Sequence, residues 1–183
     1  MFSVKNKNIV ITGGSGVIGS AISVALAQNG ATVVLLGRNK QKLQYAFDKI
    51  AAYGQHHMQF VCDVLDTKSL EAVKDKIHQQ IPQIDVLINV AGGAAPGAST
   101  KTEFLTPDTP FEDSIFGINL SDFKYTTDLN FTGSVIPIKV FAETMAKRQN
   151  GNIINISSMG AIQPLSKSPA YSAGKAAISN FTQ

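Results

Sequence analysis

The chain has 183 residues, of which 44% are apolar and 16% are charged, the composition of one ordinary globular domain with a sizeable core. Its net charge of +3 is the difference between sixteen lysines and arginines and thirteen acids, and the cations are scattered with no run of three, so we expect no nucleic-acid partner. Its one cysteine, Cys62, lies in an apolar run and excludes an internal disulfide framework and a cysteine-based zinc site, and we expect no metal.

The N-terminus enters an apolar run at Asn8, which leaves no room for a signal peptide. No apolar run approaches the ~20 residues that span a bilayer. We therefore expect no membrane partner and a cytoplasmic location.

Apolar runs alternate with amphipathic segments along the chain. The runs predict strands, and the segments at 3.6-residue spacing predict helices. We expect strands over residues 8–12, 32–37, 58–64, 84–90 and 151–157. We expect helices over 17–29, 39–53, 67–80, from a cap at Ser121 to about 148, and from Pro169 onward. In the first helix, Val17, Ala21 and Ala25 are expected on the apolar face with Ile18, Ile22 and Leu26.

Continuous apolar strands that alternate with helices indicate an α/β fold, a doubly wound parallel sheet in three layers. We expect a single domain over residues 1–183. Such sheets bind ligands at the carboxyl ends of their strands. The predicted functional loops are therefore residues 12–19, 37–40, 63–66, 90–98 and 157–168.

The first of these loops reads TGGSGVIG, from Thr12 to Gly19. Its G-x-G-x-x-G spacing is weak alone, because it also suits a merely tight turn. Between a first strand and a first helix it predicts a dinucleotide site, in which glycines admit the pyrophosphate to a positively polarised helix end. We favour the dinucleotide site.

The end of the second strand reads LLGRN. Gly37 stands where an NAD site would place an acidic residue, and Arg38 follows it with a guanidinium that suits the 2′-phosphate of NADP. The alternative for Arg38 is a solvated residue that opens a helix. Asp63, after the third strand, could hydrogen-bond the adenine amino group, or be a plain strand-end acid. We therefore expect NADP, with NAD possible.

The segment SSMGAIQPLSKSPAYSAGK contains the catalytic candidates. Tyr171 and Lys175 share one face of the last helix, because residues four apart do so. Ser158 ends the fifth strand. Reduction of a ketone by hydride requires a proton donor to the carbonyl oxygen; a nearby ammonium stabilises a phenolate, and a serine hydroxyl can hold the substrate oxygen.

The motifs TGGSGVIG, CDV, NVAGG, DLNFTG, NISS and YSAGK resemble those of the short-chain dehydrogenase/reductase family from Met1 to Gln183. The resemblance implies a Rossmann-type fold in which Tyr171 is the general acid/base and Lys175 stabilises its phenolate and binds the nicotinamide ribose. It also implies that Ser158 orients the carbonyl and that Asn130 holds a water in the proton relay. The cofactor-binding residues it implies are Thr12, Gly13, Gly14, Ser15, Gly16, Val17, Ile18, Gly19, Arg38, Asn39, Asp63, Val64, Asn89, Ala91, Gly92, Tyr171 and Lys175.

Two features of the sequence point to one branch of this family. Val17 replaces a glycine of the usual turn, and residues 91–120 form a long insertion expected on the substrate side. Both are similar to the sugar-acid branch, the D-mannonate oxidoreductase (fructuronate reductase) type close to gluconate 5-dehydrogenases. This implies a small-molecule partner, a sugar acid, and NAD(P)(H)-dependent interconversion of a keto-sugar acid with its hydroxy acid. A 3-oxoacyl thioester reductase is the alternative enzyme.

The chain stops at Gln183, inside the helix of Tyr171 and Lys175, where family members continue through further strands. The resemblance thus implies a fold that lacks the last strands, and a non-catalytic nucleotide-binding remnant is the alternative outside the enzymes. For the full-length form it implies a homo-oligomer, a tetramer or a dimer.

Overall fold

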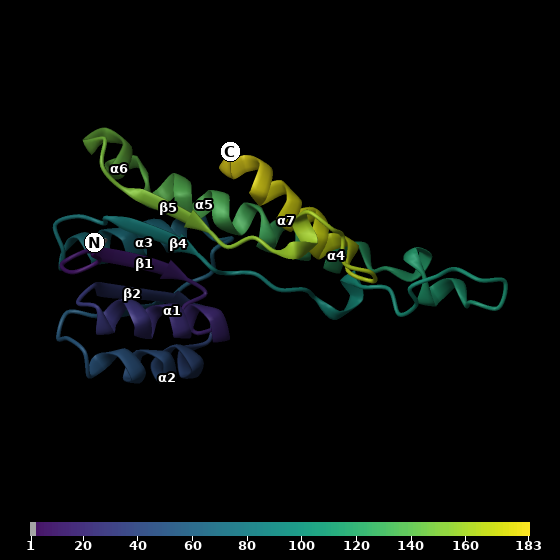
Figure 1. Ribbon diagram of the computed structural model, residues 1–183, viewed down its shortest axis with the longest axis horizontal. Helices are drawn as coiled ribbons and strands as arrows, with labels where there is room; N and C mark the ends of the chain where they lie inside the picture. Colours follow the sequence, from purple (N-terminus) through teal and green to yellow (C-terminus); the bar gives the residue numbers. More distant parts are fainter. Residues whose placement is uncertain (1–2) are drawn as a thin grey trace. The chain divides into compact units, whose positions relative to one another are not determined.

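The computed structural model describes residues 3–183 (Figure 1). Met1 and Phe2, the start of the stretch in which we expected no signal peptide, lie outside the described residues. The chain forms two compact units. The sheet unit contains the residues up to Ala91 together with Val135–Ile156, and the helix unit contains Gly92–Ser134 together with Ser157–Gln183.

The sheet unit is built on five parallel strands in the order β3-β2-β1-β4-β5. Their bounds are β1 Asn8–Thr12, β2 Thr32–Gly37, β3 Met58–Val61, β4 Val86–Asn89 and β5 Asn152–Asn155. The register aligns Ile9 of β1 with Val33 of β2 and Val86 of β4. The expected parallel sheet is confirmed, although β3, β4 and β5 are shorter than their apolar runs.

Helices cover both faces of this sheet. Their bounds are α1 Val17–Gln28, α2 Lys40–Ala51, α3 Thr67–His78, α5 Thr132–Phe141 and α6 Glu143–Arg148. Figure 1 shows α1 and α2 on one face of the sheet and α3 on the other. Strand side chains alternate between the faces: Ile9 and Ile11 pack in the core with α1 and α2, whereas Val10 packs in the core with α3 and α5. The three-layer arrangement is confirmed.

The buried face of α1 differs from our expectation. Val17 is 90% exposed and Ala21 and Ala25 are exposed, while Gly19, Ser23 and Ala27 are buried. Small side chains face the strands because the helix lies very close to the preceding turn: a Cβ at Gly19 would lie 2.3 Å from the Gly13 carbonyl oxygen. The expectation that Val17 begins the apolar face was therefore wrong.

The helix expected from Ser121 to about residue 148 is three helices. The first, α4, spans Leu120–Asn130, and α5 and α6 follow. Phe131 leaves helical geometry at φ −114° and ψ −70°, and Pro137 inside α5 has no backbone N–H to donate. The cap is Asn119, whose Oδ1 accepts the N–H groups of Ser121 and Asp122, so the expected Ser121 cap was wrong by two residues.

The helix unit pairs α4 with α7, which spans Pro169–Thr182. Pro169 occupies the first turn of α7 after Ser168, as the sequence predicts. Phe131 and Phe181 meet edge to face at a centroid distance of 5.9 Å. Four short 3-10 turns complete the unit: η1 Pro96–Ala98, η2 Phe111–Asp113, η3 Ile115–Gly117 and η4 Met159–Ala161.

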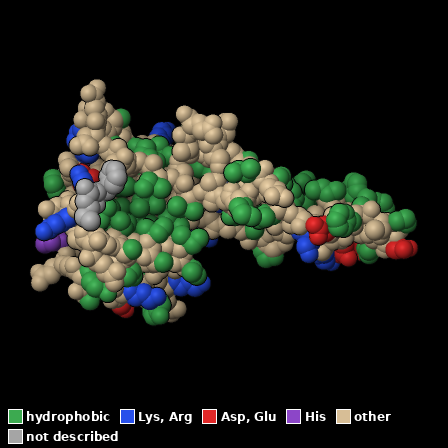
Figure 2. Space-filling model, viewed as in Figure 1, with side chains coloured by type: hydrophobic (Ala, Val, Ile, Leu, Met, Phe, Trp, Pro, Cys, Tyr) green, Lys and Arg blue, Asp and Glu red, His purple; other side chains and the backbone are tan. Residues whose placement is uncertain are grey.

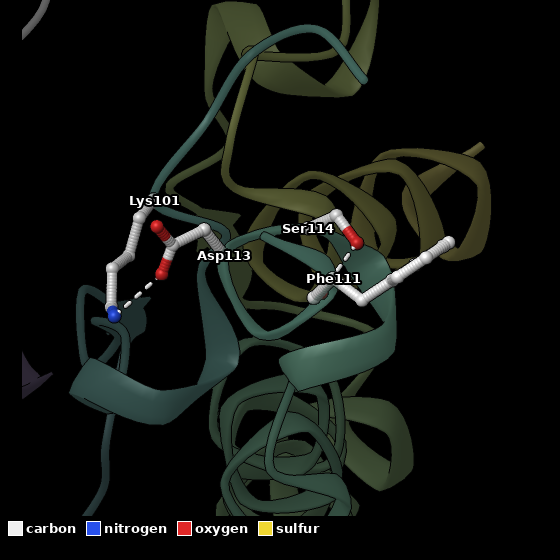
Figure 3. A network of polar contacts seen from close by, with 4 residues as sticks. All are labelled: Lys101, Phe111, Asp113 and Ser114. Carbon is white, nitrogen blue, oxygen red and sulfur yellow. Dashed lines mark hydrogen bonds and ion pairs between the residues drawn. The ribbon is translucent and has the colours of Figure 1, made fainter. Parts of the chain in front are cut away.

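Residues 99–119 form an arm of the helix unit. The backbone N–H groups of Lys101 and Thr102 both donate to the Asp113 carbonyl, and Lys101 Nζ lies 2.6 Å from Asp113 Oδ1 (Figure 3). The Ser114 hydroxyl donates to the Phe111 carbonyl at 2.7 Å. Apolar and acidic side chains share the surface of the arm (Figure 2), including Phe104 and Phe116, which are 72% and 69% exposed. None of the helices in residues 3–183 has the length and apolar character needed to cross a membrane.

Candidate functional site

The turn between β1 and α1 brings the backbone of Gly13 against the loop that follows β4. Gly13 has a φ of +64°, and a Cβ there would lie 2.8 Å from the backbone N and Cα of Ala91. Thr12 fixes the same loop, because its fully buried Oγ1 accepts the N–H groups of Val90 and Ala91 at 3.1 and 3.3 Å. Thr12 thus holds two predicted cofactor-binding segments, 12–19 and 89–91, together.

The N-terminus of α1 follows this turn without a side-chain cap. Gly16 is the N-cap residue, its first turn holds no acidic residue, and Ile18 beside it is 56% exposed. The N–H groups of a first helical turn have no intrahelical acceptor and lie at the positive end of the helix dipole. An uncapped terminus of this kind suits a pyrophosphate, so the residues present fit a dinucleotide.

The ends of β2 and β3 lie side by side in the sheet unit. Arg38 Nη1 lies 3.8 Å from Asp63 Oδ2, and both side chains are partly exposed. The other carboxylate oxygen of Asp63 accepts the N–H of Leu65 at 2.9 Å. Asn39 caps α2 through the N–H of Lys42, and Val64 is buried. The structure thus places side by side the two charged residues, Arg38 and Asp63, that the sequence predicts at the adenosine.

Asn89, at the end of β4, has one unused acceptor. Its Nδ2 donates to Asn155 Oδ1 on the neighbouring strand at 2.9 Å. Its buried Oδ1 has no hydrogen-bond partner among the described residues. Sequence reasoning missed Asn155, and the signal was available, because both asparagines end adjacent strands. Buried acceptors are normally satisfied, so this oxygen also fits a ligand that donates a hydrogen bond.

The helix unit contains all four predicted catalytic residues, and Asn130 is central among them. Its side chain is fully buried; Nδ2 donates to the carbonyls of Gly93 and Thr126 at 2.6 and 2.8 Å, and Oδ1 accepts the N–H of Gly93 at 3.3 Å. Both amide protons are thereby used, while Oδ1 keeps a second lone pair. Asn130 therefore shapes the loop at Gly92 and Gly93 and can accept one further hydrogen bond.

Lys175 lies near the same loop, and Tyr171 lies beside Lys175. A Cβ at Gly92 would lie 2.8 Å from Asn130 Oδ1 and 3.4 Å from Lys175 Nζ, so both groups border Gly92. Lys175 Nζ lies 5.9 Å from the centroid of the Tyr171 ring. Lys175 is 6% exposed, and burial lowers the pKa of its ammonium. Asn130 and Lys175 therefore lie beside Gly92, and Tyr171 lies beside Lys175, as the spacing predicts for Tyr171 and Lys175 and as the family resemblance implies for Asn130.

Ser158 caps the short turn η4, where its Oγ accepts the N–H of Gly160 at 3.1 Å. A Cβ at Gly160 would lie 3.3 Å from the hydroxyl of Ser172, in the first turns of α7. The Ser158 turn thus packs on the helix segment that contains Tyr171. Ser158 is partly exposed, which leaves its hydroxyl accessible to a substrate.

In residues 3–183 the side chains that commonly bind metals do not form a cluster, and the one cysteine is buried. No group of three or more histidine, cysteine, aspartate or glutamate side chains is arranged there to hold a metal ion. Cys62 is buried, as expected, and burial raises the pKa of its thiol to about 11. The thiol is therefore protonated at neutral pH.

The comparisons with known proteins agree with this arrangement. The family model described as short chain dehydrogenase matches residues 7–183. The chain belongs to the short-chain dehydrogenase family.

Two curated relatives are similar over nearly the whole chain. An uncharacterized oxidoreductase of Haemophilus influenzae is 39% identical over 182 residues, which are 99% of this chain and 64% of the relative. The uncharacterized oxidoreductase UxuB of Bacillus subtilis is 41% identical and covers 98% of this chain and 64% of the relative. The chain thus spans just under two thirds of the length of these proteins.

Two solved structures share the fold. One, from Haemophilus influenza with bound NAD, is provisionally described as a D-mannonate oxidoreductase. The two sequences are 38% identical, and the match covers 98% of this chain and 65% of that protein with a TM-score of 0.92. The other is an NAD⁺-bound xylitol dehydrogenase, 26% identical, covering 99% of this chain and 64% of that chain, with a TM-score of 0.84. The Rossmann-type fold of this chain is confirmed, and the chain covers 65% and 64% of these two proteins.

Proposed function

We propose that this protein is an NAD(P)(H)-dependent oxidoreductase that interconverts a keto-sugar acid and its hydroxy acid, of the fructuronate and mannonate kind. The observation that carries the proposal is the grouping, in one compact unit, of Asn130 and Lys175 around Gly92 with Tyr171 beside Lys175. The relative described as a D-mannonate oxidoreductase supports the substrate class.

The chain's own residues have distinct tasks in this reaction. A nicotinamide dinucleotide, when bound, supplies or accepts the hydride. Ser158 donates a hydrogen bond to the carbonyl oxygen, and Tyr171 gives that oxygen its proton, or removes it in the reverse direction. Lys175 stabilises the phenolate that remains. The free lone pair of Asn130 Oδ1 holds a water that returns a proton toward Lys175.

Replacement of the proton donor tests the proposal. Tyr171→Phe removes the hydroxyl and keeps the ring, so turnover of fructuronate should fall by about 100-fold or more, while NADPH affinity stays within about twofold. The measurements are the initial rate of NADPH oxidation and a fluorescence titration with NADPH. Retained turnover in Tyr171→Phe would refute the assignment of the proton donor.

The substrate class is tested with competing ketones. Faster reduction of acetoacetyl thioester than of fructuronate would replace the sugar-acid proposal by a 3-oxoacyl thioester reductase. NADPH binding without turnover of any ketone would instead indicate a nucleotide-binding remnant. Cytoplasmic location and a homo-oligomeric full-length form stay predictions.

We further propose a preference for NADP over NAD, supported by Arg38 and by the buried Gly37 that stands where an acid would hold the ribose. The pairing of Arg38 with Asp63 is partly exposed and therefore weak, so a 2′-phosphate can replace it at little cost. Arg38→Ala should weaken NADPH binding about 10-fold, the value of roughly one charge-assisted hydrogen bond, and leave NADH binding nearly unchanged. Lys42→Ala, on the exposed side of α2, is the matched control. An equal loss for both dinucleotides would contradict this preference.

A further inference from the structure

The cations of the helix unit are few. Residues 92–134 and 157–183 contain four lysines and no arginine; the lysines are Lys101, Lys124, Lys167 and Lys175. Lys101 is paired with Asp113 and Lys124 with Asp128. Lys175 is buried beside Tyr171. Lys167 is exposed, and its ammonium has no hydrogen bond or ion pair among residues 3–183.

The position of Lys167 in the fold is well defined. It lies in the segment that connects Ser158 to Tyr171, two residues before Pro169 begins α7. Its carbonyl accepts the N–H of Thr100 at 3.0 Å, which ties this segment to the base of the arm. On the other side the N–H of Leu165 donates to the Ser172 hydroxyl at 3.1 Å. The segment is therefore held between the base of the arm and the first turns of α7.

The backbone at Lys167 has a φ of +65°. This left-handed region is unfavourable for a residue with a long side chain and is usually filled by glycine or asparagine. Lys167 therefore adopts a conformation that its own backbone disfavours. Outliers of this kind gather at ligand-binding sites, so the side chain is a candidate for function.

The net charge of the helix unit bears on whether an anionic substrate can bind near Lys167. The helix unit contains six carboxylates and four ammonium groups, a net charge of −2; the acids are Glu103, Asp108, Glu112, Asp113, Asp122 and Asp128. A negative unit repels an anionic substrate at long range. An unpaired cation in this unit offsets that repulsion and can bind a carboxylate directly.

We propose that Lys167 binds the carboxylate of the acid substrate while Ser158 and Tyr171 engage its carbonyl oxygen. The inference rests on the proposed function, since it assigns the carboxylate contact of the same site. It makes Lys167 a specificity residue: it separates a sugar acid from a neutral sugar and takes no part in proton transfer.

The test compares an acid with a neutral ketose. Lys167→Met should raise the KM for fructuronate about 10-fold or more, with kcat changed by less than about twofold. The KM for fructose and the affinity for NADPH should stay unchanged. Lys167→Arg should restore most of the acid affinity. Lys124→Met is the matched control, because it removes a paired, exposed lysine of the same unit.

The outcomes separate the two proposals. Unchanged fructuronate KM in Lys167→Met, or equal losses for fructuronate and fructose, would overturn the role of Lys167 and leave the oxidoreductase proposal intact. Failure of the wild-type protein to reduce fructuronate while it reduces another ketone would overturn the substrate class. Ligand-observed NMR with mannonate and mannitol makes the same comparison of an acid with a neutral polyol without turnover. Mannonate binding that survives Lys167→Met would overturn the inference. Absence of mannonate binding to the wild type would also overturn it.

Discussion

At the residue scale, the glycines of the first turn do not have equal roles. Gly13 combines a left-handed backbone with the close approach of Ala91, whereas a Cβ at Gly16 would lie 3.3 Å from the Gly13 carbonyl oxygen, its nearest neighbour. Such a contact is tight but needs only a shift of a few tenths of an ångström. The turn therefore depends on Gly13 much more than on Gly16, although both belong to the same sequence motif.

Substitution by alanine tests this difference. Gly13→Ala should destabilise the fold by about 1–3 kcal/mol, since it adds backbone strain and forces the loop at Ala91 away, and should abolish NADPH binding. Gly16→Ala should lower stability by less than about 1 kcal/mol. Urea unfolding and NADPH titration provide the measurements; similar losses in the two variants would show that the close approach of Ala91 does not control the turn.

At the scale of elements, a buried histidine connects the start of β3 to β2. His57 is 9% exposed, and its Nδ1 accepts the N–H of Val33 at 3.1 Å. Burial lowers the pKa of His57 below its ordinary value of 6.5, with a smaller contribution from the charge of His56. Protonation of Nδ1 would remove the hydrogen bond to β2. The packing of β3 against β2 therefore favours a neutral ring.

This preference predicts a dependence of stability on pH. Because the folded-state pKa is lowered, the unfolded chain binds the proton more readily as pH falls below about 6.5. The contribution of neutral His57 is complete above pH 6.5 and is lost as the pH falls toward the folded-state pKa. His57→Asn keeps an acceptor for Val33 and cannot titrate, so the stability loss between pH 7.5 and pH 5 in urea unfolding should be smaller than in the wild type. His56→Asn is the control, and an equal pH dependence in His57→Asn would contradict the assignment.

At the scale of the whole molecule, β5 forms an open edge of the sheet. It pairs with β4 on one side, and Ile153 and Ile154 are 39% and 46% exposed. A groove of about 560 Å³ lies beside it, lined by Ile138, Lys139, Ala142, Glu143, Met145, Ala146, Gln149, Asn150, Gly151 and Ile153. An exposed apolar edge strand is a site for pairing with another chain.

We expect copies of the 183-residue chain to associate through this edge as the protein concentration rises. Ile153→Lys combined with Ile154→Lys should lower the apparent mass at high concentration in light-scattering measurements, because charged side chains block edge pairing. Tyr45→Lys, which replaces one exposed apolar side chain on α2, should have little effect. Association that persists in the double variant would place the contact elsewhere.

The periodicity and spacing of residues in the sequence predicted many features of this structure. Strand and helix periodicity predicted five strands in one parallel sheet, and the spacing of Tyr171 and Lys175 predicted that they lie beside each other on α7. These features depend on residues close in the chain or on one face of a helix. The positions that differed, such as the exposed Val17 and the break at Phe131, depend on what packs against them, and neighbouring residues do not encode that.

The tertiary structure alone decided the groups that lie far apart in sequence. The hydrogen bonds of Asn130 to Gly93 and of Thr12 to Ala91, and the tie between Thr100 and Lys167, join segments through folding and leave no periodic signal. The unpaired state of Lys167 is also visible only in three dimensions, because it requires knowing which acids lie beside the other lysines. Sequence therefore determined the fold and the candidate site residues, while packing decided which of their side chains are paired with neighbours.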